Sequence, residues 1–427
     1  MTLENRVQTI AYIGAWLPSL SETFVYNELL AVRDAGWPVV PCSVYHPKRA
    51  VSTKDLADLA SETTIVYSFS GWLHSIAELL THPLSSLSTI SLGIRDGLRG
   101  EPRSLAVRIK CSIQALGSLG LARKLRARGV GHIHAHMANT PTTIAMYAAK
   151  QLGIGFSFTG HANDLFVHRS LLNEKLQRAS FVACISDWHR RFYQSIAAVS
   201  QDKLPIIRCG VDIPPLEMSA QQSEVSKVES TVPFRILSVG RLVDKKGMDT
   251  LIRAIALIDP NHLIRCDIIG DGPLKPMLAE LIETLSLRER VVLRGACPNT
   301  EVLEAVRQCD VFVLACQRDA VTDDQDGIPV SLMEAMARSK CVITTNLDPI
   351  TELVIHERTG LTFPVRDPIS LAKVLEFAIA DSKSRFRIAA AGRAHIERAF
   401  SKAGNVKKLD DFFLRSALSG KFGSRRK

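Results

Sequence analysis

The sequence predicts an α/β protein that consists of two doubly wound domains. Short runs rich in Val, Ile and Phe recur along the chain, and amphipathic stretches of roughly 10–15 residues separate them. The runs are nearly continuous in apolar residues, which is typical of parallel strands covered by helices on both faces. A polar segment at 214–232 interrupts the series. A linker is therefore expected there, and the 427 residues divide into two domains.

The first half alternates strand and helix patterns up to residue 211. Strands are expected at 10–16, 39–45, 132–137, 156–161, 181–186 and 206–211, with helices at 22–35, 141–152 and 187–197. The stretch 69–128 fits the alternation poorly, and two or three helices are expected there.

The second half repeats the alternation with a clearer rhythm. Strands are expected at 234–240, 266–272, 291–295, 311–316 and 341–346, and helices at 247–258, 274–286, 300–308 and 329–339. Doubly wound sheets bind ligands at the carboxyl ends of their strands, so the site is expected in a cleft between the two domains.

The net charge of +10 is unevenly distributed. Residues 1–213 hold 22 basic and 15 acidic side chains, and the last 37 residues hold 10 and 3. Within 101–128 there are seven basic residues and one acid, Glu101. This segment is either a solvated basic helix face or a surface that docks on anionic lipid. A nucleic-acid binder would explain the charge but none of the motifs described below.

The cysteines and the N-terminus indicate a cytoplasmic protein. There are nine cysteines, an odd number, and no two of them have CxxC spacing. Several lie inside apolar runs, so we expect free thiols in a reducing compartment. Glu4 and Arg6 precede the first apolar run and no small-residue cleavage site follows, which argues against a secretory signal. No uncharged apolar run is long enough to span a bilayer. A cytoplasmic location is expected, with peripheral contact to the inner face of the membrane as the open alternative.

The segment DGIPVSLMEAMA at 326–337 carries the strongest chemical signal. Pro329 suits the first turn of a helix, whose exposed N–H groups form an anion site. Asp326 at the helix mouth and Glu334 two turns further could accept hydroxyl groups of a sugar and a ribose. The alternative is an acid that stabilises the helix dipole together with a surface glutamate.

Two further segments indicate a phosphate site. Arg241 and Lys246 follow the first strand of the second half, where two cations suit a diphosphate; a solvated turn is the alternative. In IIGDGPLK, Lys275 stands where a dinucleotide-binding sequence has its third glycine, so that motif is absent. The pair Gly270 and Gly272 still predicts a tight turn that a ligand could approach.

Taken together, GRLVDKKG, IGDGPL, VVLRG and GIPVSLMEAMA resemble, in order and spacing, the donor-binding half of the retaining nucleotide-sugar glycosyltransferases of family 4. Residues 18–39, 132–166 and 185–192 resemble bacterial exopolysaccharide members of the colanic-acid type. The resemblance covers roughly residues 8–380, weakly at 46–128. It implies a GT-B fold, with two Rossmann-like domains facing across a cleft.

The resemblance also implies the tasks of the domains. Residues 1–213 would bind the acceptor, and a C-terminal helix at about 391–420 would pack back on them. After the linker at 214–232, residues 233–390 would bind the nucleotide-sugar donor.

The resemblance assigns donor roles to residues of the second half. Arg241 and Lys246 would neutralise the diphosphate, and Glu334 would bind the ribose. Asp326, where the family usually has glutamate, would face the donor sugar. The remaining donor-binding residues would contribute backbone: Gly14 from the first half, then Gly270, Gly272, Gly295, Gly327 and Ile328.

The resemblance assigns the other roles to the first half. His161 in TGHANDLF would contact the sugar near the reacting carbon, and Asp164 would border the acceptor pocket. Glu22 and Thr23, with Ser21, would approach donor and acceptor. Glu22 could equally serve a capping box that starts at Ser19.

No metal and no cofactor are expected, because the nucleotide sugar is itself a substrate. His132, His134 and His136 alternate along a strand and are expected to pack or form hydrogen bonds on one face. Asp324-Gln325-Asp326 resembles the DxD of metal-dependent transferases with another fold, and here Arg241 and Lys246 would do the cation's electrostatic work.

The predicted function is transfer of a sugar from a UDP- or GDP-sugar to a hydroxyl of a saccharide or lipid-linked saccharide. Retention of configuration and a role in cell-surface polysaccharide synthesis follow from the resemblance. Two alternatives stay open: a nucleotide-sugar 2-epimerase of the same fold, and a non-catalytic nucleotide-sugar binder.

Overall fold

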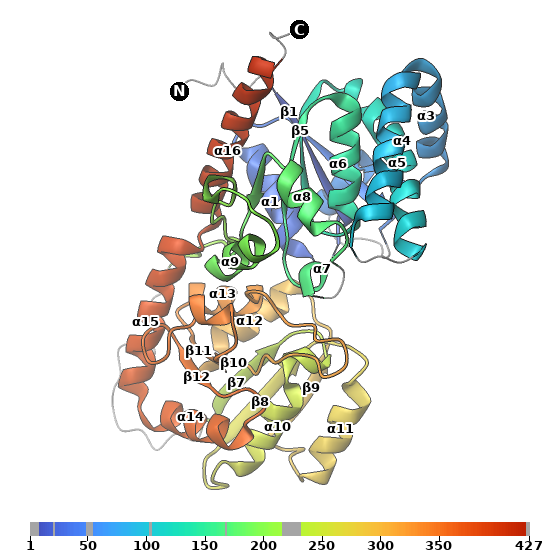
Figure 1. Cartoon of the computed structure of the whole chain (residues 1–427). Helices are drawn as coiled ribbons and strands as arrows, with labels where there is room; N and C mark the ends of the chain where they lie inside the picture. The colour runs from blue at the N-terminus through green and yellow to red at the C-terminus, as the bar shows by residue number, and fades with distance from the viewer. Residues whose placement is uncertain are drawn as a thin grey trace. The chain divides into compact units, whose positions relative to one another are not determined.

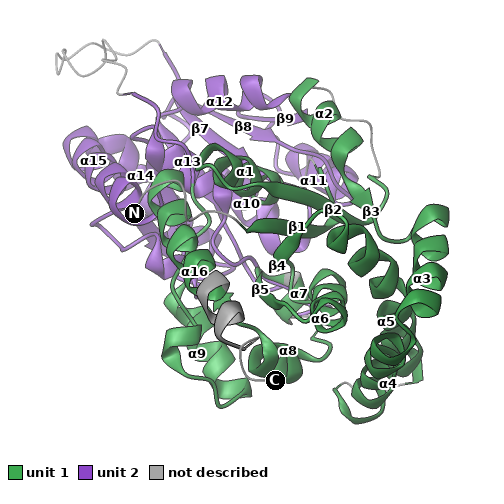
Figure 2. Cartoon of the chain, turned by 90° about the horizontal axis from the view of Figure 1, so that it is seen from above, with its two compact units in different colours: residues 1–210, 402–427 green, residues 211–401 purple. Residues whose placement is uncertain are grey.

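The computed structural model describes residues 8–19, 22–47, 54–101, 105–166, 169–215 and 232–423. The chain divides into two compact units, shown in Figure 2. Unit 1 comprises residues 1–210 and 402–427, and unit 2 comprises residues 211–401. The predicted linker at 214–232 lies almost wholly outside the described residues.

Unit 1 is built on a six-stranded parallel sheet of order β3-β2-β1-β4-β5-β6. Its strands are β1 (Thr9–Trp16), β2 (Val39–Tyr45), β3 (Thr64–Ile65), β4 (Val130–His136), β5 (Gly155–Thr159) and β6 (Phe181–Ala183). The strand expected at 206–211 is wrong: this segment makes only isolated bridges, Ile206 with Cys184 and Val211 with Ser401. The two-residue strand β3 is too short to leave a pattern in the sequence.

Helices cover both faces of this sheet, as Figure 1 shows. They are α1 (Thr23–Asp34), α2 (Lys54–Glu62), α3 (Phe69–Thr81), α4 (Pro83–Arg99), α5 (Leu105–Arg126), α6 (Thr140–Leu152), α7 (Asn163–Phe166), α8 (Leu172–Arg178), α9 (Asp187–Ile196) and α16 (Lys402–Gly423). Successive residues of β1 enter different cores, because side chains alternate along a strand. Ile10 and Tyr12 pack with the residues of α1 and α16, whereas Ala11 and Ile13 pack with those of α5 and α6.

Three helices, α3, α4 and α5, fill the stretch 69–128 that fits the alternation poorly. Among the described helices, only α5 has the length and apolar composition of a membrane-spanning helix. Half of its most apolar window is buried, as in the central helix of a folded unit.

The capping box proposed for Ser19 and Glu22 is not formed. Helix α1 begins at Thr23, and Glu22 occupies the N-cap position without a side-chain cap hydrogen bond. Glu22 therefore does not stand at the third position of a helix that starts after Ser19, as a capping box requires.

Unit 2 repeats the architecture with sheet order β12-β11-β10-β7-β8-β9, again wholly parallel. Its strands are β7 (Phe234–Val239), β8 (Ile264–Ile269), β9 (Val291–Gly295), β10 (Val311–Leu314), β11 (Cys341–Thr345) and β12 (Leu361–Phe363). The helices are α10 (Met248–Leu257), α11 (Lys275–Thr284), α12 (Asn299–Gln308), α13 (Val330–Ala337), α14 (Pro368–Ala380) and α15 (Ser382–Ala399). The five predicted strands are confirmed, and β12 is an addition.

The chain returns to unit 1 later than predicted. The helix expected at about 391–420 is two helices, because α15 ends at Ala399 and α16 begins at Lys402. Helix α15 packs on α13 in unit 2, whereas α16 packs on α1 and β4 in unit 1. The break coincides with a bond from the Val211 N–H to the Phe400 carbonyl, which joins the outgoing and returning segments.

Candidate active site

The predicted donor residues gather at one edge of the unit 2 sheet. All strands are parallel, so their carboxyl ends share that edge. The strand order changes direction between β7 and β10, and such a switch point is where doubly wound sheets open a crevice for ligands. Arg241 follows β7, Lys246 ends the short 3₁₀ helix Asp244–Lys246, and Asp326 lies beyond β10. The fold therefore places the two cations and the acid at the switch point.

Lys246 and Asp326 form an ion pair within this edge. The Lys246 Nζ lies 2.7 Å from Asp326 Oδ2, and both side chains are largely buried. Lys245 Nζ lies 2.8 Å from Asp324 Oδ2 and 3.5 Å from Asp326 Oδ1. Burial opposes the charge on Asp326, but the two ammonium groups outweigh it and lower the pKa of Asp326. The pKa of Lys246 is raised: burial opposes its charge, and the Asp326 carboxylate more than offsets this effect.

Glycines bring the backbone close together around this pair. Gly247 has φ of +60°, and a Cβ there would lie 1.9 Å from the Ala315 carbonyl oxygen. A Cβ on Gly270 would lie 1.9 Å from the Gly240 oxygen, and one on Gly272 would lie 2.4 Å from the Leu242 oxygen. Only glycine permits these approaches. The turn at 270–272 thus packs against the loop that carries Arg241, and Gly295, with φ of +74°, ends the neighbouring strand β9.

Helix α13 supplies the rest of the predicted donor site. It begins after Pro329 without a side-chain cap, and it follows the buried residues Gly327 and Ile328. Glu334 lies half-buried on this helix, and burial raises the pKa of its carboxyl group. Its backbone carbonyl accepts a bond from Arg338 at 3.0 Å, which leaves its carboxylate out of that contact.

The predicted residues of unit 1 meet at the corresponding edge of its own sheet. His161 follows β5, and its imidazole is almost fully buried. Its Nε2 lies 3.1 Å from Nδ1 of His136, the last residue of β4. The His136 Nε2 in turn lies 3.0 Å from Oε1 of Glu28 on α1. Glu28 and His136 were not singled out as site residues; the alternation of histidines in HIHAHM was the signal for His136.

This chain of contacts links the tautomer of His161 to Glu28. Glu28 is an acceptor, and it also receives the Tyr12 hydroxyl at 3.1 Å, so His136 donates to it through Nε2. When His136 carries only this proton, its Nδ1 accepts from His161 Nε2, and the Nδ1 of His161 is an acceptor that faces the Cys209 thiol at 3.7 Å. Burial, reinforced by neighbouring imidazoles, lowers the pKa of His161 well below its usual value. His161 is therefore neutral, and its tautomer depends on the proton that His136 shares with Glu28.

The carboxylate of Asp164 binds backbone N–H groups of nearby loops. It is buried, and its carboxylate accepts bonds from the backbone N–H groups of Ala138 at 2.6 Å, Ala162 at 2.9 Å and His161 at 3.2 Å. These bonds hold the segment that carries His161, and the place of Asp164 at the border of an acceptor pocket stays a prediction.

The other residues predicted for unit 1 make fewer contacts that would define a role. Glu22 and Thr23 stand at the start of α1, and Ser21 lies outside the described residues. Gly14 is buried in β1, and a Cβ there would make only ordinary contacts with Leu17 and Val25. The structure does not require glycine at this position, so its predicted approach to a donor stays a prediction.

The three alternating histidines form a buried hydrogen-bonded row. His132 and His134 both contact the Ser157 hydroxyl, at 2.7 and 2.8 Å. Glu28, His134 and His136 each offer a ligand atom within 4.8 Å of the others, as a metal site would require. Both ring nitrogens of His136 already have hydrogen-bond partners, His161 and Glu28. Action without a metal stays a prediction.

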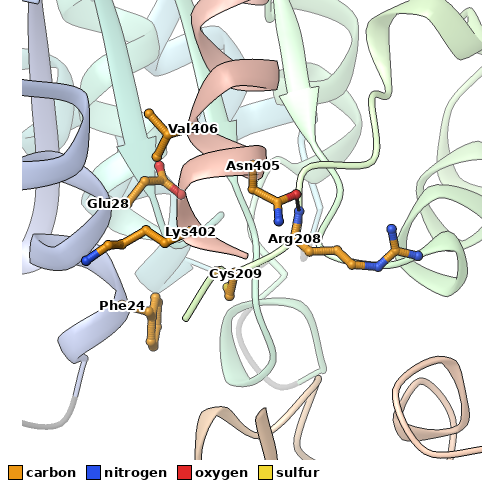
Figure 3. Close-up of a pocket in the computed structure, with 8 residues that line it drawn as sticks. Phe24, Glu28, Arg208, Cys209, Lys402, Asn405 and Val406 are labelled. Carbon is orange, nitrogen blue, oxygen red and sulfur yellow. Dashed lines mark hydrogen bonds between the residues drawn. The ribbon is translucent and has the colours of Figure 1, made fainter. Parts of the chain in front are cut away.

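A narrow pocket of about 10 Å³ opens beside Glu28, with room for about one water molecule. Figure 3 shows residues around it from three segments of unit 1: α1, residues 208–210, and the start of α16. The Asn405 side chain accepts the Arg208 N–H at 3.0 Å and so joins two of these segments. Glu28, Lys402 and Arg208 all line the pocket, and the Arg208 guanidinium points away from Glu28 (Figure 3).

Comparisons with known proteins show what the chain is similar to. The profile of the family described as "Glycosyl transferases group 1" matches residues 221–395. The putative colanic acid biosynthesis glycosyltransferase WcaL of Escherichia coli K12 is 32% identical over 229 residues, which are 53% of this chain and 54% of that protein. The amylovoran biosynthesis glycosyltransferase AmsK of Erwinia amylovora is 32% identical over 186 residues, 43% of this chain and 46% of that protein. The chain thus spans about half the length of these curated relatives.

A solved structure resembles the whole chain. Anabaena Alr3699/HepE, solved with UDP, superimposes with a TM-score of 0.67 at 15% identity and covers 95% of this chain and 99% of its own. The same protein has been solved with UDP-glucose, with a TM-score of 0.66, 16% identity and coverage of 95% and 99%. At this identity the likeness shows the fold: two parallel six-stranded sheets in the GT-B arrangement.

Proposed function

We propose, on the premise that residues 221–395 form a glycosyltransferase group 1 domain within a GT-B fold, that this chain transfers a sugar from a nucleotide-diphosphate sugar to a hydroxyl group. The donor is a UDP- or GDP-sugar. The acceptor is a saccharide or a lipid-linked saccharide in the synthesis of an exopolysaccharide or another cell-surface polysaccharide. The names of WcaL and AmsK support this pathway class, and the UDP bound to HepE supports UDP as the first nucleotide to test.

The observation that carries the proposal is the placement of Arg241 and Lys246 at the switch point of the unit 2 sheet. A diphosphate needs concentrated positive charge, and Lys246 is kept charged and oriented by its 2.7 Å contact with Asp326. The turns at Gly270 and Gly272 keep side chains away from the same edge. Glu334, about one turn into α13, provides a carboxylate at a depth that suits ribose hydroxyls.

The proposed reaction needs no protein nucleophile. The bond from the anomeric carbon to the diphosphate oxygen breaks, and a bond from that carbon to the acceptor oxygen forms on the same face of the sugar. The acceptor proton passes to the departing phosphate oxygen. Arg241 and Lys246 offset the charge that develops on this leaving group. The neutral His161 contacts the sugar near the reacting carbon.

The test is an assay of the purified chain with a panel of UDP- and GDP-sugars and a lipid extract as acceptor. We expect release of free nucleoside diphosphate with a labelled, extractable product that keeps the anomeric configuration by NMR. We also expect turnover to survive a metal chelator. Conversion of the donor to an epimer without acceptor would instead establish the epimerase. Tight nucleotide binding with no transfer to any acceptor would establish the binder.

A further inference from the structure

The helices α3, α4 and α5 expose an unusual number of large apolar side chains. On α3 these are Phe69, Trp72, Leu73, Ile76 and Leu80, and Phe69 and Leu80 are 82% and 75% exposed. Their spacing of three and four residues places them on one stripe of the helix. In the described part of unit 1, the large apolar side chains that are exposed lie on these three helices, with Tyr45 as the exception.

The neighbouring helices continue the pattern. The exposed apolar residues of α4 are Leu84, Leu87, Ile94 and Leu98. Those of α5 are Leu105, Ile109, Ile113 and Leu116. We call these residues, with those of α3, the apolar face. Figures 1 and 2 both show the three helices grouped together at one side of unit 1. Contiguous apolar surface of this kind on a folded unit marks an interaction site.

The inward side of α3 and α4 has the opposite character. Its buried positions are small or polar: Gly71, Ser75 and Glu78 on α3, and Ser86, Thr89, Gly93, Asp96 and Gly97 on α4. A surface helix in water normally turns its large apolar residues to the core. Small residues and satisfied polar groups at helix contacts, with apolar residues outside, are instead typical of helices that meet lipid.

The buried acids are paired within the unit. Glu78 is fully buried, and its carboxylate accepts bonds from Arg126 and from Gln151, each at 2.8 Å. Asp96 accepts two bonds from Arg178, at 2.6 and 2.8 Å. These two residues are the acids of α3, α4 and α5. The outward side of the three helices therefore carries no carboxylate.

The exposed charges on the same helices are all basic. Arg95, Arg99, Arg108 and Lys110 are exposed next to apolar-face residues in the sequence. None has a carboxylate within ion-pair distance among the described residues. A surface that combines apolar side chains with unpaired cations complements the interface of an anionic bilayer, where both contributions add. A water-soluble protein partner would not require the absence of acids.

An aromatic row connects this face with the carboxyl edge of the unit 1 sheet. Trp16, at the end of β1, stacks on Tyr45 with 5.6 Å between ring centroids, and Tyr45 lies 5.6 Å from Tyr67. Tyr67 stacks on Trp72 of α3 at 5.7 Å. Trp and Tyr concentrate where a protein passes from lipid to water.

A groove of about 370 Å³ lies along this row. It is lined by Tyr45 and Tyr67 and by residues of α5 that include Ile109, Lys110 and Ile113. Its lining is mostly apolar, and Lys110 is its one cation. The apolar face thus extends toward the edge where His161 lies.

We propose that the apolar face of α3, α4 and α5 inserts into the interface of an anionic lipid bilayer. This inference does not depend on the proposed function, because membrane binding is measured without turnover. If the chain is also a glycosyltransferase, the surface holds its acceptor edge at the membrane, where lipid-linked saccharides reside.

The test is co-sedimentation of the full chain with vesicles of phosphatidylcholine alone or mixed with phosphatidylglycerol. We expect binding to the anionic vesicles that weakens with salt. The variant Leu73→Gln with Ile76→Gln and Leu80→Gln should lose roughly tenfold or more in partitioning. Its matched control, Leu257→Gln with Leu263→Gln, changes residues of unit 2 with similar exposure and should bind like wild type.

The charge is tested separately. Arg108→Gln with Lys110→Gln should weaken binding to anionic vesicles roughly tenfold, whereas Lys373→Gln with Arg387→Gln should not. Brominated lipids should quench Trp72, and the quenching should fall in Trp72→Phe. Circular dichroism melts check that each variant is folded.

Three outcomes overturn the inference. One is equal sedimentation of wild type and the α3 variant, and another is no binding of wild type to either vesicle. The third is a wild-type dimer that the α3 variant converts to monomer while vesicles bind neither form, which would make the face a contact between copies.

Discussion

The Lys246 ammonium lies 2.7 Å from the Asp326 carboxylate, across 80 residues of sequence. The contact exists because β7 and β10 are neighbours in the unit 2 sheet. It keeps a lysine charged in a largely buried place, where burial alone would favour its neutral form. The predictions below begin from this pair.

Lys246→Ala should remove most turnover, by roughly 100-fold or more in kcat, because it deletes a charge that offsets the leaving diphosphate. Lys245→Ala is the matched control, since Lys245 contacts Asp324 at 2.8 Å and lies farther from Asp326, at 3.5 Å. We expect a much smaller loss there. Steady-state kinetics with the preferred donor provide the measurement. Near-normal transfer by purified Lys246→Ala would show that Lys246 does not neutralise the donor diphosphate.

Asp326→Asn should destabilise unit 2 by about 3 kcal/mol, because it leaves the buried Lys246 without its counter-charge. Urea unfolding of the full chain, followed by a probe in unit 2, measures this loss. Asp326→Glu restores the length that the family usually has. If it matches wild type in both stability and turnover, the shorter acid is no handicap. Equal stability of Asp326→Asn and wild type would contradict the importance of the pair.

Glu334→Ala should weaken nucleotide binding roughly tenfold while kcat changes little, since a lost ribose contact costs about 1.4 kcal/mol in ground and transition state alike. A titration with UDP or GDP would shift to higher concentration. Arg338→Ala serves as a control at the end of the same helix, because it removes a bond to the backbone carbonyl of Glu334 and leaves the Glu334 carboxylate in place. An unchanged titration would place the ribose elsewhere.

Glu28→Gln should lower kcat with little change in the donor KM, because Glu28 acts through His136 on His161. An amide can donate to His136 Nε2, which reverses the tautomers along the row and places a proton on Nδ1 of His161. Glu28→Asp keeps the acceptor charge and should recover part of the activity. If kcat is the same in Glu28→Gln and wild type, the tautomer of His161 has no catalytic consequence.

The stability of unit 1 should fall steeply with acid. Burial lowers the pKa of His132 to about 3 and, against a partly compensating bond to a carbonyl, that of His189 to about 4. Burial also lowers the pKa of His134 and of His161 well below the usual value. The unfolded chain protonates these imidazoles near pH 6.5, so the unfolded state binds more protons below that pH. Below that pH, each histidine lowers the free energy of unfolding by about 1.4 kcal/mol for every unit by which the pH falls. The four histidines together lower it by on the order of 5 kcal/mol per pH unit.

Urea unfolding between roughly pH 5 and 7 measures this slope. Stability should be fully present above about pH 6.5 and lost as the pH falls. His132→Phe, which keeps a ring against Phe181, should reduce the slope by about one proton. A flat profile over this range would show that the imidazoles are protonated in the folded state.

Much of unit 2 could be predicted from the sequence. Its five longer strands and four of its helices have unbroken apolar patterns, and glycine, proline and charged residues mark where each ends. The residues at strand ends, such as Arg241 and Gly270, could therefore be assigned to one edge. The short strands β3 and β12 were not predicted, because two and three residues are too few to show a repeating pattern.

By itself, the sequence determined the α/β class, the division into two sheets and the edge at which Lys246 and His161 lie, because hydrophobic periodicity is a local property of the chain. Only the tertiary structure decided which residues meet there. The Lys246–Asp326 ion pair and the hydrogen bonds from Glu28 through His136 to His161 join strands and helices that are distant in sequence. It also decided that α3 and α4 bury their small and polar side and expose their large apolar side. Periodicity identifies the two sides of a helix, but the surface against which the helix packs determines which side is buried.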